Sequence, residues 1–136
     1  MRIILDKKAL DKSLQNITIA IHKLIRDNTA KGIDMNGSRF AKYSEPYIKY
    51  KSKYQKGKGS GSNVNLMLTG NMLRAISRKR AGDGYDIYFK EAKMMERATY
   101  HHFGNGQPKR AFFGVSQESE RAIFNKYMTE IGSFSK

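Results

Sequence analysis

The residues of this sequence best suited to catalysis or metal binding are two adjacent histidines, His101 and His102. Adjacent side chains point to opposite sides of a strand and diverge by about 100° on a helix, so the two imidazoles do not converge on one ion. The chain has no cysteine, and no histidine stands four residues from another, so a zinc site lacks ligands. We expect one packed and one exposed histidine here.

Other catalytic patterns are not indicated either. A nuclease of the His-His type, with Asn105 nearby, would need a different spacing and a third histidine after the pair. No serine, histidine and acid set for acyl transfer stands out. We therefore expect no enzymatic activity, no metal and no cofactor.

Basic side chains are the second group that could do chemistry. The chain has 26 Lys and Arg against 12 Asp and Glu, a formal net charge of +14. Such an excess attracts polyanions and supports phosphate binding through counterion release, although a solvated surface is the alternative. The residues expected to make assembly or phosphate contacts are Lys56, Lys58, Arg74, Arg78, Arg80, Lys109 and Arg110.

Residues 45–53 predict a short basic helix, with Ser44 as its N-cap. Tyr47, Tyr50 and Tyr54 share one face of it, with lysines between them. Cations can hold phosphates while rings stack on bases, as on a nucleic-acid surface. An ordinary solvated helix has the same pattern, so both interpretations stay open.

A long amphipathic helix is predicted over residues 7–30, ending at a Gly32 cap. Its apolar residues recur at alternating spacings of four and three, at Leu10, Leu14, Ile17, Ile21 and Leu24. This stripe could cover a sheet of the same subunit or pair with a second copy. Fewer than four heptads are present, which favours the core. His22 falls off the stripe, and we expect it to be exposed.

Two stretches are predicted to turn or to move. Asn36 and Gly37 suit the positive φ of a tight turn. Residues 56–63, KGKGSGSN, predict a mobile basic loop that could become ordered on contact with a neighbour. The loop lacks the glycine and lysine spacing of a nucleotide-binding P-loop.

The second half of the chain predicts a hairpin between helices. Thr69 is the expected N-cap of a helix over residues 71–76. Residues 82–84 predict the turn of a hairpin that returns over residues 85–89. Residues 91–97 suit a loop or a helix, with Met94 and Met95 filling the core.

Aromatic, glycine and proline residues over 98–116 predict a sharply turned, tightly packed segment. Residues 118–131 predict the last helix, with Ala122, Ile123, Tyr127 and Ile131 on one side.

Length and composition indicate one domain. A chain of 136 residues can bury a single core, and without cysteine no disulfide supports it. The first residues carry only a three-residue apolar run, too short for a signal peptide or a membrane span, so we expect no membrane contact. The expected class is α+β: a long N-terminal amphipathic helix packed on a small antiparallel sheet, with short helices and a C-terminal helix.

Four motifs in order carry a resemblance to a known family. They are GSRFAKYS at 37–44, LTGNMLRAI at 68–76, YHHFG at 100–104 and PKRAFFG at 108–114. The sequence resembles the phage virion morphogenesis or tail-completion family over residues 35–117. The positions that match and are expected to define the fold are Phe40, Tyr43, Thr69, Gly70, Leu73, His102, Phe103, Gly104, Pro108, Phe112 and Gly114.

This resemblance implies a structural protein of tail completion or head-tail joining. It would act as several copies, with a ring as one form, and contact other phage head-tail or tail proteins. Its place would be the virion, and the host cytoplasm during assembly. The alternative is a basic nucleic-acid-binding module from an unrelated context, and nonspecific DNA contact fits both.

Overall fold

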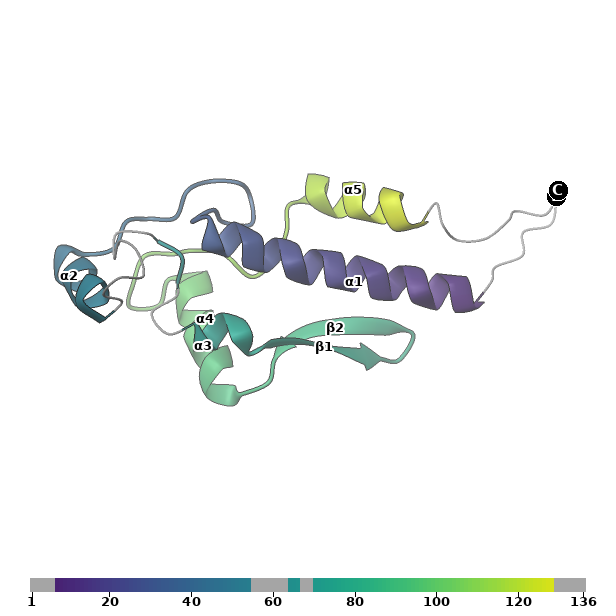
Figure 1. Ribbon diagram of the computed structural model, residues 1–136, viewed down its shortest axis with the longest axis horizontal. Helices are drawn as coiled ribbons and strands as arrows, with labels where there is room; N and C mark the ends of the chain where they lie inside the picture. Colours follow the sequence, from purple (N-terminus) through teal and green to yellow (C-terminus); the bar gives the residue numbers. More distant parts are fainter. Residues whose placement is uncertain (1–6, 55–63, 67–69, 129–136) are drawn as a thin grey trace.

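A computed structural model describes residues 7–54, 64–66 and 70–128 of the chain (Figure 1). The elements in order are α1 (Lys7–Ala30), α2 (Glu45–Tyr54), α3 (Asn71–Arg74), β1 (Ile76–Ala81), β2 (Gly84–Phe89), α4 (Ala92–Phe103) and α5 (Gln117–Met128). This architecture confirms the α+β class, with a long N-terminal helix, a small antiparallel sheet, short helices and a C-terminal helix. None of the helices described combines the length and apolar content of a membrane span.

Helix α1 is the central element of the fold. It contacts α5 on one side and the β1–β2 hairpin on another (Figure 1). The hairpin is antiparallel, with Ile76 opposite Phe89 at its base and Ala81 opposite Gly84 at its turn. Two strands alone are marginally stable in water, so packing against α1 must supply most of the hairpin's stability.

The buried face of α1 differs from the predicted stripe. Of the five stripe residues only Ile17 is fully buried, while the other four are half-buried. The fully buried set also includes Ser13, Thr18, His22 and Thr29. The prediction that His22 is exposed was wrong, because the hairpin covers a side of α1 that periodicity did not mark as apolar. Thr18 and Thr29 satisfy their hydroxyls by donating to carbonyls one turn earlier in the helix.

The predicted cap of α1 and the turn after it are both confirmed. Gly32 has a φ of 78°, its amide donates to the Thr29 carbonyl, and the next amide, of Ile33, donates to Asn28. This pair of bonds is the Schellman motif that ends many helices. Beyond it, Gly37 has a φ of 89° in the predicted turn, where the Asp34 carboxylate accepts two backbone amides.

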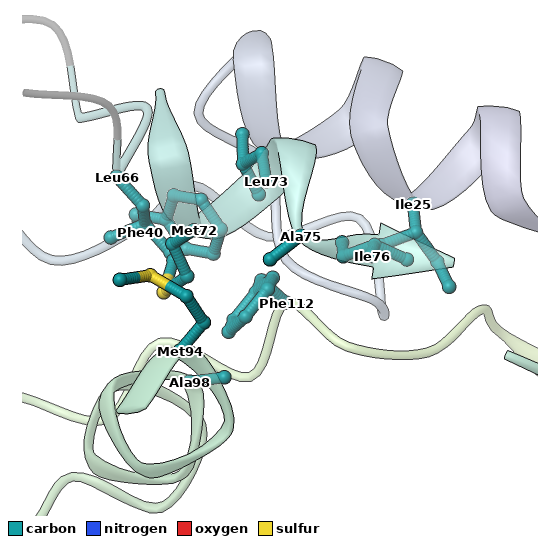
Figure 2. Packing of buried hydrophobic residues seen from close by; sticks show 10 residues of the cluster. All are labelled: Ile25, Phe40, Leu66, Met72, Leu73, Ala75, Ile76, Met94, Ala98 and Phe112. Atoms are coloured by element: carbon teal, nitrogen blue, oxygen red, sulfur yellow. The ribbon is translucent and has the colours of Figure 1, made fainter. Parts of the chain in front are cut away.

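The hydrophobic core joins α1, α3, β1, α4 and the segment before α5 (Figure 2). Phe112, 1% exposed, lies among side chains from several of these elements. Its neighbours in the cluster are Ile25, Phe40, Leu66, Met72, Leu73, Ala75, Ile76, Met94 and Ala98. Only one of these residues comes from α1, so the core lies at the end of the hairpin where α3 and α4 meet.

Two predicted boundaries in the second half were wrong. Helix α3 ends at Arg74, not at residue 76, because Ile76 already pairs with Phe89 in β1. Helix α4 continues to Phe103, so residues 98–103 are helical and not a turned segment. The turn begins only at Gly104, which caps α4 with a φ of 79°.

Other predicted positions are partly matched. Met94 lies in the core, whereas Met95 on the next helical position is 59% exposed. In α5, Ile123 and Tyr127 are half-buried but Ala122 is exposed. Thr69, the 56–63 loop and residues 129–131 lie outside the described residues.

Candidate functional site

A basic groove runs between α1 and the segment formed by α3 and β1. It comprises two adjoining cavities of about 590 and 470 Å³, which share Ile19 and Arg78 in their linings. Arg26, Arg74 and Arg78 line the larger cavity, and Arg80 lines the smaller one. The structure therefore brings together three of the predicted contact residues, Arg74, Arg78 and Arg80, and adds Arg26.

Strand alternation explains how β1 presents its basic run. Arg78 and Arg80 lie on the face of the hairpin toward α1, where they meet His22 and Asp11 respectively. Lys79 between them lies on the other face, with its ammonium 4.6 Å from the centre of the Tyr88 ring. The three neighbouring cations therefore do not form one exposed cluster.

Arg80 is held by a carboxylate. Its guanidinium forms an ion pair with Asp11, which also accepts a hydrogen bond of 3.0 Å from the Tyr85 hydroxyl. The Arg80 guanidinium lies 5.5 Å from the Tyr85 ring centre. These contacts join β1 to the first turns of α1 and offset the charge of Arg80.

Arg78 is held by a neutral imidazole instead. Its Nη1 lies 3.0 Å from Nδ1 of His22. Burial, and then the charges of Arg78 and Arg26, lower the pKa of His22, which favours the neutral ring. Because guanidinium can only donate, Nδ1 must accept and the ring proton stays on Nε2. That Nε2 is buried and has no partner among the described residues.

The Lys109–Arg110 pair separates into one surface and one buried side chain. Lys109 is exposed, as predicted for a contact residue, but Arg110 is only 3% exposed. Arg110 donates from Nε to the Ala41 carbonyl at 3.0 Å and from Nη2 to the Lys42 carbonyl at 3.1 Å. The prediction that Arg110 presents exposed charge was wrong, because it links the segment before α5 to the segment before α2.

Tyr43 stands at the centre of this buried polar cluster. Its ring lies 4.9 Å from the Arg110 guanidinium and 5.0 Å from the Lys51 ammonium. Its hydroxyl accepts the Leu66 amide at 2.9 Å, and burial raises its pKa. Lys51 is 1% exposed and donates to Asn65. Lys51 is thus structural, which removes it from any phosphate-binding face of α2.

The predicted helix over residues 45–53 is present as α2. Its first turn is capped by Ser44, whose hydroxyl accepts the Tyr47 amide at 3.4 Å. Tyr47 is half-buried and packs on Tyr43 with ring centres 4.7 Å apart, while Tyr50 is 54% exposed. The rings do not form an open stacking surface, because Tyr47 is engaged inside the chain.

The two adjacent histidines lie in the last turn of α4. Both are half-buried, so the expectation that one is exposed was wrong. His102 Nδ1 accepts the Phe113 amide at 3.3 Å, and His101 Nδ1 is buried without a partner among the described residues. Burial lowers both pKa values, before the nearby cations do. Within the described ranges, no three His, Asp or Glu side chains gather as metal ligands.

The remaining predicted positions have mixed surroundings. Gly70 has a φ of 82°, and a Cβ on Gly114 would lie 2.9 Å from Cε of Met35, so both need glycine locally. Pro108 is exposed. Phe103 is 70% exposed, which contradicts the packed position expected for it. Lys56 and Lys58 lie outside the described residues.

An exposed apolar surface on α4 was not predicted. We call Met95, Tyr100 and Phe103 the outer α4 face; they are 59%, 37% and 70% exposed. Met94 and Ala98, on the opposite side of the same helix, are buried. The sequence signal for such a face was the second apolar spacing of eight residues, from 95 to 103, which equals about two turns.

Comparisons with protein-family models, with curated proteins and with solved structures find no match to this chain.

Proposed function

We propose that this protein is a phage structural protein of tail completion or head-tail joining. It acts through contacts with further copies of itself and with neighbouring head-tail or tail proteins, in the virion and in the host cytoplasm during assembly. Two arguments support this proposal. The first is the ordered resemblance of the four sequence motifs to that family. The second is the outer α4 face.

The outer α4 face is the observation that carries the proposal. Single exposed apolar residues are ordinary on soluble proteins, but a large ring and a thioether on one face of one helix are costly to leave in water. Covering Phe103 and Met95 would contribute about 1.5 to 3 kcal/mol for each side chain. Aromatic and methionine side chains are also enriched at protein interfaces.

Position in the fold also suits an interface. Helix α4 is anchored from behind by Met94 and Ala98, so its outer face is held on a rigid support. Partners that dock on such a helix pay little ordering entropy on this side of the contact. The protein acts stoichiometrically, and the exposed face is buried in the assembled state.

Light scattering over a dilution series tests self-association. We expect a species of defined copy number for the wild type and a shift toward monomer for the double variant Met95→Ser and Phe103→Ser. Ile19→Ser is the matched control, because Ile19 is 44% exposed on α1 and lies off the outer α4 face. A wild type that stays monomeric at every concentration would contradict assembly by itself.

A complementation test addresses the phage role directly. Electron microscopy of lysates from a phage lacking this gene, supplied with the double variant, should show separate heads and tails. Complete particles at the wild-type yield would overturn the assignment of the outer α4 face to joining.

A further inference from the structure

The larger cavity of the basic groove has an excess of positive charge that the proposed assembly role does not use. Arg26, Arg74 and Arg78 all line it. Asp27 is the acidic residue in its lining, and it already forms a 3.0 Å ion pair with Lys23. Arg26 makes no hydrogen bond or ion pair with another described residue. The charge in this part of the groove is therefore not cancelled by carboxylates within it.

The two arginines of β1 show that this charge is kept by construction. Arg80 is paired with a carboxylate, whereas Arg78, two residues earlier on the same face, is held by a neutral imidazole. A carboxylate would fix the guanidinium and offset its charge; an imidazole acceptor fixes it and leaves the charge in place. One of the five guanidinium N–H groups of Arg78 is used by His22, and this contact limits the orientation of the others.

We propose that the cavity lined by Arg26, Arg74 and Arg78 binds a phosphate group, and that His22 is a positioning residue that orients the Arg78 guanidinium. This inference does not depend on the assembly role. A guanidinium fork matches two oxygens of a phosphate, and cations from different elements can reach different oxygens of a tetrahedral group. A planar carboxylate offers fewer directions for such contacts.

The buried Nε2–H of His22 is a second, independent sign of a missing acceptor. His22 lines the same cavity, and its Nε2 has no partner among the described residues. Buried donors without acceptors are rare because each costs about 1 to 3 kcal/mol. An anion held by Arg26 and Arg78 is an acceptor that a small shift of the ring would reach.

The size of the cavity leaves room for more than an inorganic ion. At about 590 Å³ it could hold a phosphate ester whose remaining atoms lie over Ile19. The ester could belong to a small phosphorylated molecule or to the backbone of a nucleic acid. Both sources share the phosphate chemistry, and they differ in what lies beyond the binding arginines.

Titration of ¹⁵N-labelled protein with inorganic phosphate tests the site by NMR. We expect saturable shifts of the amide signals of His22, Arg26 and Arg78, with affinity lowered about tenfold in Arg26→Gln and in Arg78→Gln. Arg121→Gln is the matched control, because Arg121 is exposed on α5 and removes the same charge elsewhere. Effects in Arg26→Gln and Arg78→Gln no larger than in Arg121→Gln would overturn the proposal, and the exposed Arg26 variant keeps that outcome informative if Arg78→Gln folds poorly.

Two His22 variants test positioning separately from folding. His22→Asn keeps an acceptor near the place of Nδ1, whereas His22→Leu fills similar space without one. Phosphate affinity should be retained in His22→Asn and fall several-fold in His22→Leu. Equal affinity in the two variants would remove the positioning role.

A 20-base-pair duplex distinguishes the two sources of phosphate. If the site takes nucleic-acid backbone, Arg26→Gln and Arg78→Gln should each reduce the slope of log affinity against log salt by about 1, because one phosphate contact is lost. Arg121→Gln should leave that slope unchanged. If both groove variants leave the slope unchanged while weakening inorganic phosphate, the site takes a small phosphorylated molecule. Absence of phosphate binding in the wild type refutes both.

Discussion

Replacing Arg110 by alanine should destabilise the protein far more than replacing its neighbour Lys109. The two residues are adjacent and both basic, but Arg110 is 3% exposed and Lys109 is exposed. The contrast therefore tests whether this arginine is a structural link and not a contact residue. Alanine removes the guanidinium without introducing a new polar group.

The magnitude follows from the contacts of the guanidinium. Its two hydrogen bonds to the carbonyls of Ala41 and Lys42 contribute about 1.5 kcal/mol each, because the donor is charged. The contact with the Tyr43 ring at 4.9 Å adds about 1 kcal/mol. Ala41 and Lys42 are exposed residues, so water can replace part of the loss. We expect Arg110→Ala to lower the free energy of unfolding by about 3 kcal/mol, within a total of about 5 to 15 kcal/mol.

Urea denaturation followed by far-UV circular dichroism measures this loss. With a slope of about 1.5 kcal/mol per molar urea, the midpoint should fall by about 2 M. Lys109→Ala should change the stability by less than about 0.5 kcal/mol. Arg110→Lys should lose about half of the effect, since one ammonium cannot span both carbonyls as the fork does. If Arg110→Ala were as stable as Lys109→Ala, the assignment of Arg110 as a buried link would be refuted.

Two further predictions concern a glycine and the histidines. Gly104→Ala should cost at least about 1 kcal/mol more than Gly106→Ala, as measured by thermal unfolding: both glycines have φ near 78°, but only at Gly104 would a Cβ lie 2.9 Å from the Lys109 amide nitrogen. Equal melting temperatures would contradict the close approach. All three histidines have pKa values lowered from 6.5 in the folded state, so the unfolded state takes up protons first as the pH falls. The free energy of unfolding should be insensitive to these groups above about pH 7.5 and should decrease as the pH falls through 6.5, and a melting temperature that does not drop by about pH 5.5 would show that the rings are not buried as neutral groups.

Local chemistry in the sequence determined the elements whose signals lie within a few residues. The 24 residues of α1 follow from alternating apolar spacings, and Gly32 ends the helix because only glycine adopts that φ without strain. Ser44 before Tyr47 was sufficient to predict the start of α2. The hairpin likewise follows from its glycine turn. In each case the partner atoms are close in the chain, so no tertiary information is needed.

Boundaries failed where a distant segment competed for the same backbone. The helix predicted over residues 71–76 stops at Arg74 because Ile76 pairs with Phe89 in the sheet. The turned segment predicted from residue 98 is helical to Phe103 because Met94 and Ala98 pack into the core. Propensity alone could not weigh these contacts, since the stabilising partners are not in the local window.

The tertiary structure alone decided which charged and aromatic side chains are accessible. Charge counting treats Lys51, Arg110 and Lys109 alike, yet the first two are buried beside Tyr43 and only the third is exposed. Hydrophobic patterning likewise treats Phe103 and Phe112 alike, although one is 70% and the other 1% exposed. The sequence by itself determined the net charge, the long helix and the hairpin, because these depend on composition and on neighbouring residues. Which cations share a groove depends on how the hairpin lies against α1, and that packing is a property of the folded chain.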